Sequence, residues 1–265
     1  MNAEPAAFIA AYLHEIGIYT PLLSATDPVK KNQQPRMQTA APAVAALSVV
    51  ATKTPPTQTP RPSPKNIQSP CVDQGISLRG LQEQVASCTA CALSKSRKQT
   101  VFGHGNPQPD LLFIGDAPDA DDDREGQPFA GKSGVLLNRM IEAMGLHREQ
   151  VYTMNTLKCR PPWNRDPSSE EIAACRVYFD AQLQALQPNF ICLLGRVAAW
   201  QVLGTHDGLT VLREGTYDYQ GIPVYVTYHP TYLLRNPARK QQAWQDLQRL
   251  MQLHIKPQAA HISSE

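Results

Sequence analysis

Four cysteines constrain the fold of this chain more than any other feature, because they come from two segments that lie far apart in the sequence. Cys88 and Cys91 form a close pair, and Cys159 and Cys175 follow only after a long gap. Four thiolates that converge from two distant segments make a closed ligand set for an iron–sulfur cluster or a structural zinc ion. The alternative is four unrelated buried thiols, since free cysteine is often a core residue.

From about residue 76 onward, short apolar runs alternate with helix-like segments, which is typical of a three-layer α/β domain. The apolar runs predict strands, and the segments around them predict helices. In open α/β sheets the ligand crevice lies beyond the carboxyl ends of the strands. We expect strands at 110–115, 151–155, 189–194 and 223–227, and helices at 76–87, 132–144, 169–186, 196–203 and 238–253.

Three motifs directly follow the predicted strands, and this placement indicates one shared pocket. The first covers residues 115–118 and continues at 126–137, the second covers 158–165, and the third covers 228–237. They read Gly-Asp-Ala-Pro with Gly-Gln-Pro-Phe-Ala-Gly, then Lys-Cys-Arg-Pro-Pro-Trp-Asn-Arg, then Tyr-His-Pro-Thr-Tyr-Leu-Leu-Arg. In this order they resemble the motifs of the family 4 uracil-DNA glycosylases, over about residues 85–253.

The resemblance implies a fold and a cofactor. The fold is a three-layer α/β/α uracil-DNA-glycosylase-like domain with a central, mostly parallel sheet. The resemblance also favours a 4Fe–4S cluster over zinc, with Cys88, Cys91, Cys159 and Cys175 as its ligands and with a structural role. The two remaining cysteines are not expected to be ligands.

The resemblance also implies how a base would be recognised, because a glycosylase must take its base out of the duplex and bind it in a closed pocket. Phe129 would stack on the base, although a Phe after a Pro is otherwise an ordinary core residue. Asn155 would match the O4/N3 edge of uracil, because its amide donates and accepts at once. An isolated Asn after a strand is otherwise a turn former. Gly115 and Ala117 complete the expected substrate-binding set.

Two residues are expected to be catalytic and three to contact DNA. His229 would hydrogen-bond uracil O2 as negative charge develops on the leaving base. Asp116 would position water next to an oxocarbenium-like sugar. Leu233 or Leu234 would wedge into the space that the base leaves, and Arg235 would hold a phosphate.

Two positions depart from the family pattern. Asp116 stands where the family has Glu, so its carboxylate is one methylene shorter. Asp119 stands where the family has Gly, and it adds a Cβ and a negative charge near the DNA phosphates. Residues 121–123 add further carboxylates.

The chain outside this domain divides into three further segments. Residues 1–25 predict a short amphipathic helix, which we interpret as a partner-binding peptide; the alternative is that it docks on its own domain. Residues 26–70 are rich in Pro and predict a disordered linker, because they cannot bury enough apolar surface. The iron–sulfur domain is expected at 71–255, with a flexible tail at 256–265. The peptide resembles the N-terminal peptide of the psi subunit of the bacterial DNA polymerase III clamp loader.

Two functions follow as hypotheses. The first is a monofunctional uracil-DNA glycosylase of base excision repair, a hydrolase acting on uracil in single- or double-stranded DNA. The second is a catalytically weak glycosylase-fold protein that serves as a replication interaction subunit through residues 1–25. The departures at Asp116 and Asp119 favour the second, and the intact Phe129, Asn155 and His229 favour the first.

Composition limits the kinds of partner and the cellular compartment that we expect. The net charge of +2 is nearly neutral, so any DNA contact depends on a local basic rim. No apolar stretch reaches the roughly 18 residues that a membrane helix requires. An iron–sulfur site indicates a reducing compartment, so we expect a bacterial cytoplasmic protein associated with the nucleoid.

Overall fold

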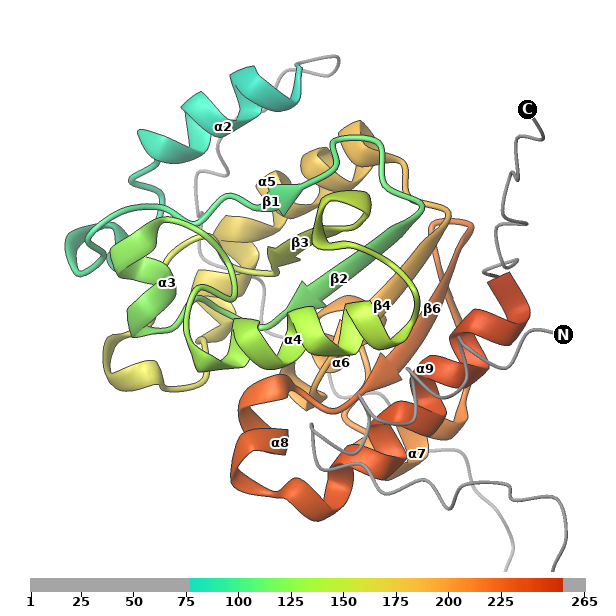
Figure 1. The fold of residues 1–265 in the computed structure, drawn as a ribbon. Helices are drawn as coiled ribbons and strands as arrows, with labels where there is room; N and C mark the ends of the chain where they lie inside the picture. Colours follow the sequence, from blue (N-terminus) through green and yellow to red (C-terminus); the bar gives the residue numbers. More distant parts are fainter. Residues whose placement is uncertain (1–76, 255–265) are drawn as a thin grey trace, which may run out of the picture. The chain divides into compact units, whose positions relative to one another are not determined.

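The computed structural model describes residues 77–254, which form helical layers on both sides of one six-stranded sheet (Figure 1). The predicted N-terminal peptide 1–25, the linker 26–70 and the tail 256–265 lie outside these residues. The strands are β1 His104–Gly105, β2 Leu111–Gly115, β3 Tyr152–Asn155, β4 Phe190–Leu194, β5 Tyr217–Tyr219 and β6 Ile222–Thr227.

The strand order is β1-β3-β2-β4-β6-β5, and the four central strands are parallel. The two edge strands, β1 and β5, pair antiparallel with their neighbours. Gly115 at the end of β2 is in register with Asn155 at the end of β3. Leu194 at the end of β4 is in register with Thr227 at the end of β6. The segments that follow all four strands therefore leave the sheet at the same edge, as the sequence predicted.

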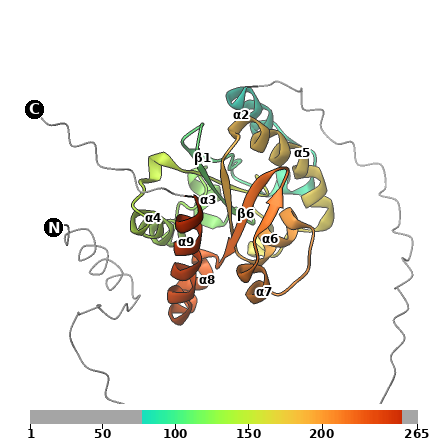
Figure 2. The same cartoon turned by 90° about the vertical axis from the view of Figure 1, so that its right-hand side faces the viewer.

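The helices cover both faces of this sheet (Figure 2). Helices α4 and α9 lie on one face, and α5 and α6 lie on the other. The helices are α2 Leu78–Ala86, α3 Ala120–Glu125, α4 Lys132–Ala143, α5 Ser169–Leu186, α6 Arg196–Leu203, α7 Leu209–Glu214, α8 Pro230–Arg235 and α9 Lys240–His254.

Successive side chains of a strand point to opposite faces of the sheet, so the core is divided between the two helical layers. In β2, Leu111 and Phe113 point toward α4 and α9, where they pack with Trp244. Leu112 and Ile114 of the same strand point to the opposite face and join a cluster that includes Phe179 of α5. All five β2 residues are buried, as expected for a central parallel strand that is covered on both faces.

Side-chain caps fix where three of the helices begin. Ser77 caps α2 by accepting a hydrogen bond from the backbone N–H of Gly80, at 3.2 Å. Ser168 and Glu171 form a reciprocal capping box at the start of α5. Asp119 forms a similar box with Asp122 at the start of α3. The caps of α3 and α5 fix two loops between strands and helices, and these loops carry parts of the first and second sequence motifs.

The four predicted strands and five predicted helices are present with small shifts at their ends. The prediction omitted the edge strands β1 and β5 and the short helices α3, α7 and α8. These elements span six residues or fewer, too short to show a helical or alternating period. Within residues 77–254, no helix is long and apolar enough to cross a membrane.

Candidate functional site

A cavity of about 320 Å³ opens at the carboxyl edge of the sheet, between the segments that follow β2, β3 and β6. All three sequence motifs contribute to its lining. Six of the predicted site residues line it: Asp116, Ala117, Phe129, Asn155, His229 and Arg235. Residues far apart in the sequence therefore meet at one place, as the motif positions indicated.

Phe129 lies in the cavity wall with an unusual backbone. Its φ is +58°, in the left-handed region that favours glycine, and its side chain is buried. The turn is held from Asp122, whose carboxylate accepts a hydrogen bond from the backbone N–H of Ala130 at 2.8 Å. The ring centroid is 5.7 Å from that of His229, with 31° between the ring planes. The local fold thus presents the Phe129 ring beside the imidazole.

Asn155 ends β3 and is buried, with its side chain bordering the cavity. Its Nδ2 atom has no hydrogen-bond partner within residues 77–254. A buried donor without a partner costs free energy, so this amide is poised for an acceptor from a ligand. Gly115 makes the arrangement possible, because a Cβ there would collide with Asn155 Oδ1 and lie 2.9 Å from Phe129 Cζ.

His229 is the N-cap residue of α8, and this position fixes its tautomer. The backbone N–H of Thr231 donates to His229 Nδ1 at 3.2 Å, so in the neutral imidazole the proton lies on Nε2. Burial lowers the pKa of His229, while the carboxylates of Asp116 and Asp119 act in the opposite direction. The site therefore holds a neutral imidazole that can donate from Nε2.

Asp116 is the carboxylate nearest to that donor. Its Oδ1 lies 3.9 Å from His229 Nε2 and accepts a hydrogen bond from the backbone N–H of Ala117 at 2.8 Å. The backbone carbonyl of Asp116 accepts from the N–H of Leu157 at 3.2 Å and from the Thr156 hydroxyl. The segments after β2 and β3 are thereby joined, and they hold the carboxylate at the cavity.

Asp119 has a structural role that its sequence position did not reveal. Its Oδ1 accepts from the backbone N–H groups of Asp121 and Asp122, at 2.9 and 3.1 Å, and so caps α3. Its φ of −92° is ordinary, so no glycine is needed there. Asp122 and Asp123 are buried as well, and Asp123 accepts from the N–H of Lys98. These carboxylates support the local fold, and Asp119 and Asp122 also line the cavity.

The two leucines expected at the DNA differ in the structure. Leu233 is buried in the core beside α4 and α9, whereas the side chain of Leu234 is 41% exposed. Leu234 is therefore the one of the pair that can contact a ligand. Arg235, at the end of α8, lines the cavity and forms no ion pair with any residue of the described domain.

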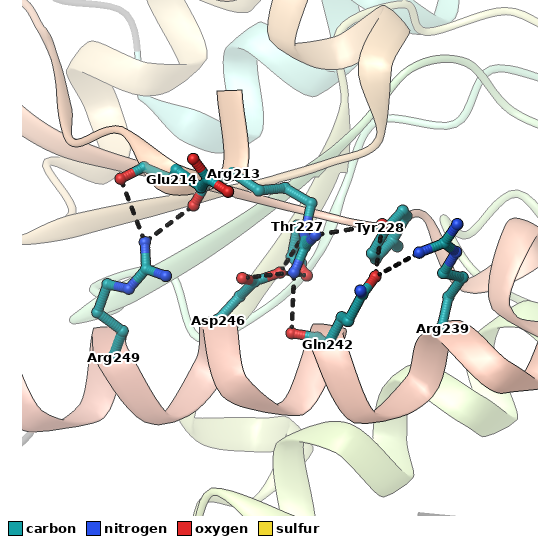
Figure 3. Close-up of polar contacts among 8 residues, drawn as sticks. All are labelled: Arg213, Glu214, Thr227, Tyr228, Arg239, Gln242, Asp246 and Arg249. Atoms are coloured by element: carbon teal, nitrogen blue, oxygen red, sulfur yellow. Dashed lines mark hydrogen bonds and ion pairs between the residues drawn. The ribbon is translucent and has the colours of Figure 1, made fainter. Parts of the chain in front are cut away.

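A buried polar network, which the sequence did not predict, supports the segment that carries His229 (Figure 3). Arg213 of α7 pairs with Asp246 of α9 through two hydrogen bonds of 2.7 and 2.9 Å. Asp246 also accepts from the Thr227 hydroxyl, at 2.7 Å. Arg213 donates to the Tyr228 hydroxyl at 3.1 Å. The two residues before His229 are thus tied to two helices.

Tyr228 extends this support to the cavity. Its hydroxyl donates to Gln242 Oε1 at 2.9 Å, and its ring lies under the guanidinium of Arg213. The ring also stacks on Tyr232, with centroids 5.3 Å apart and planes 10° apart. Tyr232 lines the cavity, so the network reaches from α9 to the ligand site.

The four cysteines lie around a second, small cavity of about 20 Å³. None of them forms a disulfide. Three of their sulfurs accept hydrogen bonds: Cys159 from Arg97 Nη1 at 3.0 Å, Cys175 from the N–H of Lys158 at 3.3 Å, and Cys88 from the N–H of Ala90 at 3.5 Å. Thiol sulfur accepts only weakly, so several N–H donors directed at sulfur suit thiolates that carry charge.

The four thiols are the type of ligand that an iron–sulfur cluster requires, and they come from both predicted segments to surround one cavity. Within residues 77–254, no three His, Cys, Asp or Glu side chains are grouped closely enough for a single metal ion. The segment after β3 joins the two cavities, because Cys159 lines the cysteine cavity and Asn164 lines the larger one.

Comparison with known proteins gives consistent matches over this region. The family model described as the uracil DNA glycosylase superfamily matches residues 102–248, more than half of the chain. The chain is 38% identical over 190 residues to the type-4 uracil-DNA glycosylase of Sulfurisphaera tokodaii, covering 68% of this chain and 86% of that protein. It is 36% identical over 190 residues to the Archaeoglobus fulgidus type-4 enzyme, covering 69% and 96%. It is 40% identical over 162 residues to the Thermotoga maritima type-4 enzyme, covering 60% and 84%.

Proposed function

Because this chain belongs to the uracil DNA glycosylase superfamily, we propose that it removes uracil from DNA by hydrolysing the N-glycosidic bond, as a monofunctional enzyme of base excision repair. The observation that carries the proposal is one cavity that holds an unpartnered Asn155 amide, the Phe129 ring and the Nε2 donor of His229. The alternative, an inactive interaction subunit, rests on the departures at Asp116 and Asp119, and the second of these residues also has a local role as the cap of α3.

Base recognition follows from the hydrogen-bonding pattern of the pocket. An extruded uracil stacks on Phe129, and Asn155 Nδ2 donates to its O4 while Oδ1 accepts from its N3–H. Cytosine presents an amino group where uracil has O4, so it would leave the Asn155 donor facing another donor. An unpaired buried donor costs about 1–3 kcal/mol, which disfavours cytosine.

Bond cleavage depends on the two polar groups beside the base. As the N1–C1′ bond breaks, its electron pair moves onto uracil, and His229 Nε2–H stabilises the negative charge on O2. Water then adds to C1′ of the sugar, and the proton that the water loses neutralises the uracil anion. The Asp116 carboxylate orients this water and offsets the positive charge of the oxocarbenium-like sugar. The 3.9 Å between the two side chains leaves them close enough to act on one nucleotide.

DNA contacts are assigned to α8. Leu234 fills the space that the base leaves in the stack, and Arg235 holds a backbone phosphate. Leu233 instead packs in the core and fixes the helix that carries both residues.

The four cysteines would hold a 4Fe–4S cluster, which would tie two distant segments together through its bonds to their sulfurs. Cys88 and Cys91 precede the short helical turn Ala92–Lys95, and Cys159 and Cys175 flank the start of α5. The test is iron and sulfide content in protein purified without oxygen. Equimolar zinc without iron would overturn this assignment.

The N-terminal peptide 1–25 is assigned to a replication partner of the clamp-loader type, on its sequence resemblance alone. The linker 26–70 would let the peptide bind a partner at a distance from the glycosylase domain. This assignment places the protein in a bacterial cytoplasm, near replicating DNA. A pull-down with residues 1–25 tests it, and failure to retain any clamp-loader subunit would contradict it.

Uracil release from a synthetic oligonucleotide by the purified protein tests the function. We expect free uracil and an abasic strand from both single- and double-stranded substrates. His229→Ala should lower the rate constant by about 10²-fold, as the loss of one such donor commonly does, with little change in binding to abasic DNA. Val211→Ala, an exposed change on α7, is the matched control. No uracil release by the parent protein would disprove the proposed activity.

A further inference from the structure

Trp163 is the most exposed large apolar side chain in the described domain. Its side chain is 95% exposed, against 62% for Val211, the next in order. Single exposed apolar residues are common on protein surfaces and need no explanation by themselves. What sets Trp163 apart is the way its backbone is held and the position that it occupies.

Hydrogen bonds hold the turn that carries Trp163 in one conformation. Trp163 and Asn164 have φ values of +59° and +52°, so two successive residues other than glycine lie in the left-handed region. The backbone N–H of Asn164 donates to the carbonyl of Pro161 at 3.1 Å, and Arg160 Nε donates to Asn164 Oδ1 at 2.7 Å. A sparsely populated backbone conformation persists only where its surroundings impose it.

The following residues anchor the turn from the other side. Arg165 donates two hydrogen bonds to the buried carboxylate of Glu171, at 2.8 and 2.6 Å. Glu171 Oε2 also accepts from the N–H of Ser168 at 2.9 Å. The indole is therefore projected into solvent from a segment that is fixed at both ends.

Trp163 lies at the rim of the larger cavity, which Phe129, Asn155 and His229 line. Its neighbours Pro161 and Asn164 line that cavity. The opposite wall comes from the β6–α8 segment, because β3 and β6 are separated in the sheet by β2 and β4. Figure 1 shows the Pro162–Asn164 turn and α8 at the same end of the sheet. Two further exposed apolar side chains, Tyr232 and Leu234, lie on α8.

We propose that Trp163 stacks on a base of the uracil-containing strand, next to the extruded nucleotide. This inference rests on the proposed function and adds a contact to it. Bases present a π-face whatever their identity, so an exposed indole binds single-stranded DNA with little sequence preference. A protein partner fits less well, because residues 164–166 beside the indole are exposed and polar and form no apolar patch.

The test compares variants on a single-stranded uracil oligonucleotide and on its abasic analogue. Trp163→Ala should raise the KM, and the Kd for abasic DNA, by about tenfold, with kcat within about twofold, because stacking adds binding without touching the reacting bond. Trp163→Phe keeps an aromatic face and should stay within about threefold of the parent. Val211→Ala is the control for an exposed apolar change away from the cavity.

Fluorescence gives a second readout that does not depend on turnover. The chain has three tryptophans, and Trp244 is buried while Trp200 is half-buried. Abasic DNA should quench the parent's emission, and Trp163→Phe should abolish that quenching, whereas Trp200→Phe should retain it. Unchanged DNA affinity in Trp163→Ala, with uracil still released by the parent, would overturn the stacking role alone. Trp163-dependent quenching without uracil release would instead support stacking and disprove the proposed activity.

Discussion

Asn155 carries the proposed base selectivity through one buried donor that has no partner within residues 77–254. Replacing its amide by a carboxylate leaves the shape of the side chain nearly unchanged and removes the donor. The consequence of the change is therefore chemical rather than steric, which makes this position a direct test of how the pocket recognises its base.

Asn155→Asp should lower uracil release by about 10²-fold or more, because the carboxylate would face O4 of uracil without a proton to donate. Release of uracil and of cytosine from otherwise identical oligonucleotides measures the change. Asn106→Asp is a matched control, since the Asn106 side-chain oxygen accepts from the N–H of Gln108 at 3.0 Å and needs no donor. Unaltered uracil selectivity would show that another group contacts the base edge.

Asp122 makes stability depend on pH. Burial raises its pKa to about 6, although the N–H of Ala130 acts in the opposite direction. Between the unfolded value near 4 and the folded value, the folded state binds the proton more tightly. Stability should therefore fall as pH rises from 4 to 6, by about 3 kcal/mol.

Asp122→Asn should flatten this dependence, because the amide oxygen still accepts from Ala130 and carries no charge. Urea denaturation at several pH values between 4 and 7 measures the difference between the variant and the parent. Parallel curves for the two proteins would show that another group titrates in this range.

Helices α7 and α9 hold the end of β6 through the Arg213–Asp246 pair (Figure 3). Both side chains are buried, with 9% and 7% of their surfaces exposed. Removal of one partner leaves a buried charge without compensation, which is strongly destabilising. The segment before His229 depends on both partners, since Thr227 donates to Asp246 and Tyr228 accepts from Arg213.

Asp246→Ala should destabilise the domain by about 3–5 kcal/mol, as measured by urea denaturation. Glu83→Ala removes one partner of an exposed ion pair with Arg79 and should change stability by less than about 1 kcal/mol. Equal effects of the two substitutions would mean that the buried network contributes little.

The longer elements could be predicted from the sequence because their patterns are strong. The run Phe190–Leu194 is apolar throughout and is a strand, as expected. Helix α3 could not be predicted, because its six residues are mostly acidic and have no apolar face. For the same reason the sequence did not predict that Asp119 caps this helix. Its expected charge near DNA stays a prediction, and its carboxylate lines the larger cavity.

The parts of the site that depend on contacts between separate elements could not be predicted from the sequence. The motif positions predicted that Phe129, Asn155 and His229 meet at one cavity, and they do. Each residue lies at the carboxyl end of a parallel strand or in the segment that follows one. Nothing in the sequence distinguishes Leu233 from Leu234, since only tertiary packing buries the first. Nor does it pair Arg213 with Asp246, which come from separate helices.

Residues 77–254 contain both cavities and a core on each face of the sheet. Deletion of residues 1–25 should therefore leave the melting temperature and uracil excision from free oligonucleotides unchanged. It should abolish association with a clamp-loader partner. A melting temperature lower by several degrees would show that the peptide packs on its own domain, as the alternative interpretation holds.

The sheet ends on both sides in very short strands: β1 has two residues and β5 has three, and both run against the direction of the central four. An unpaired strand edge is a template on which another chain can add by backbone hydrogen bonding, and its reach grows with its length. Edges this short offer almost no such template. The sheet edges of residues 77–254 therefore give other chains little opportunity to add a strand.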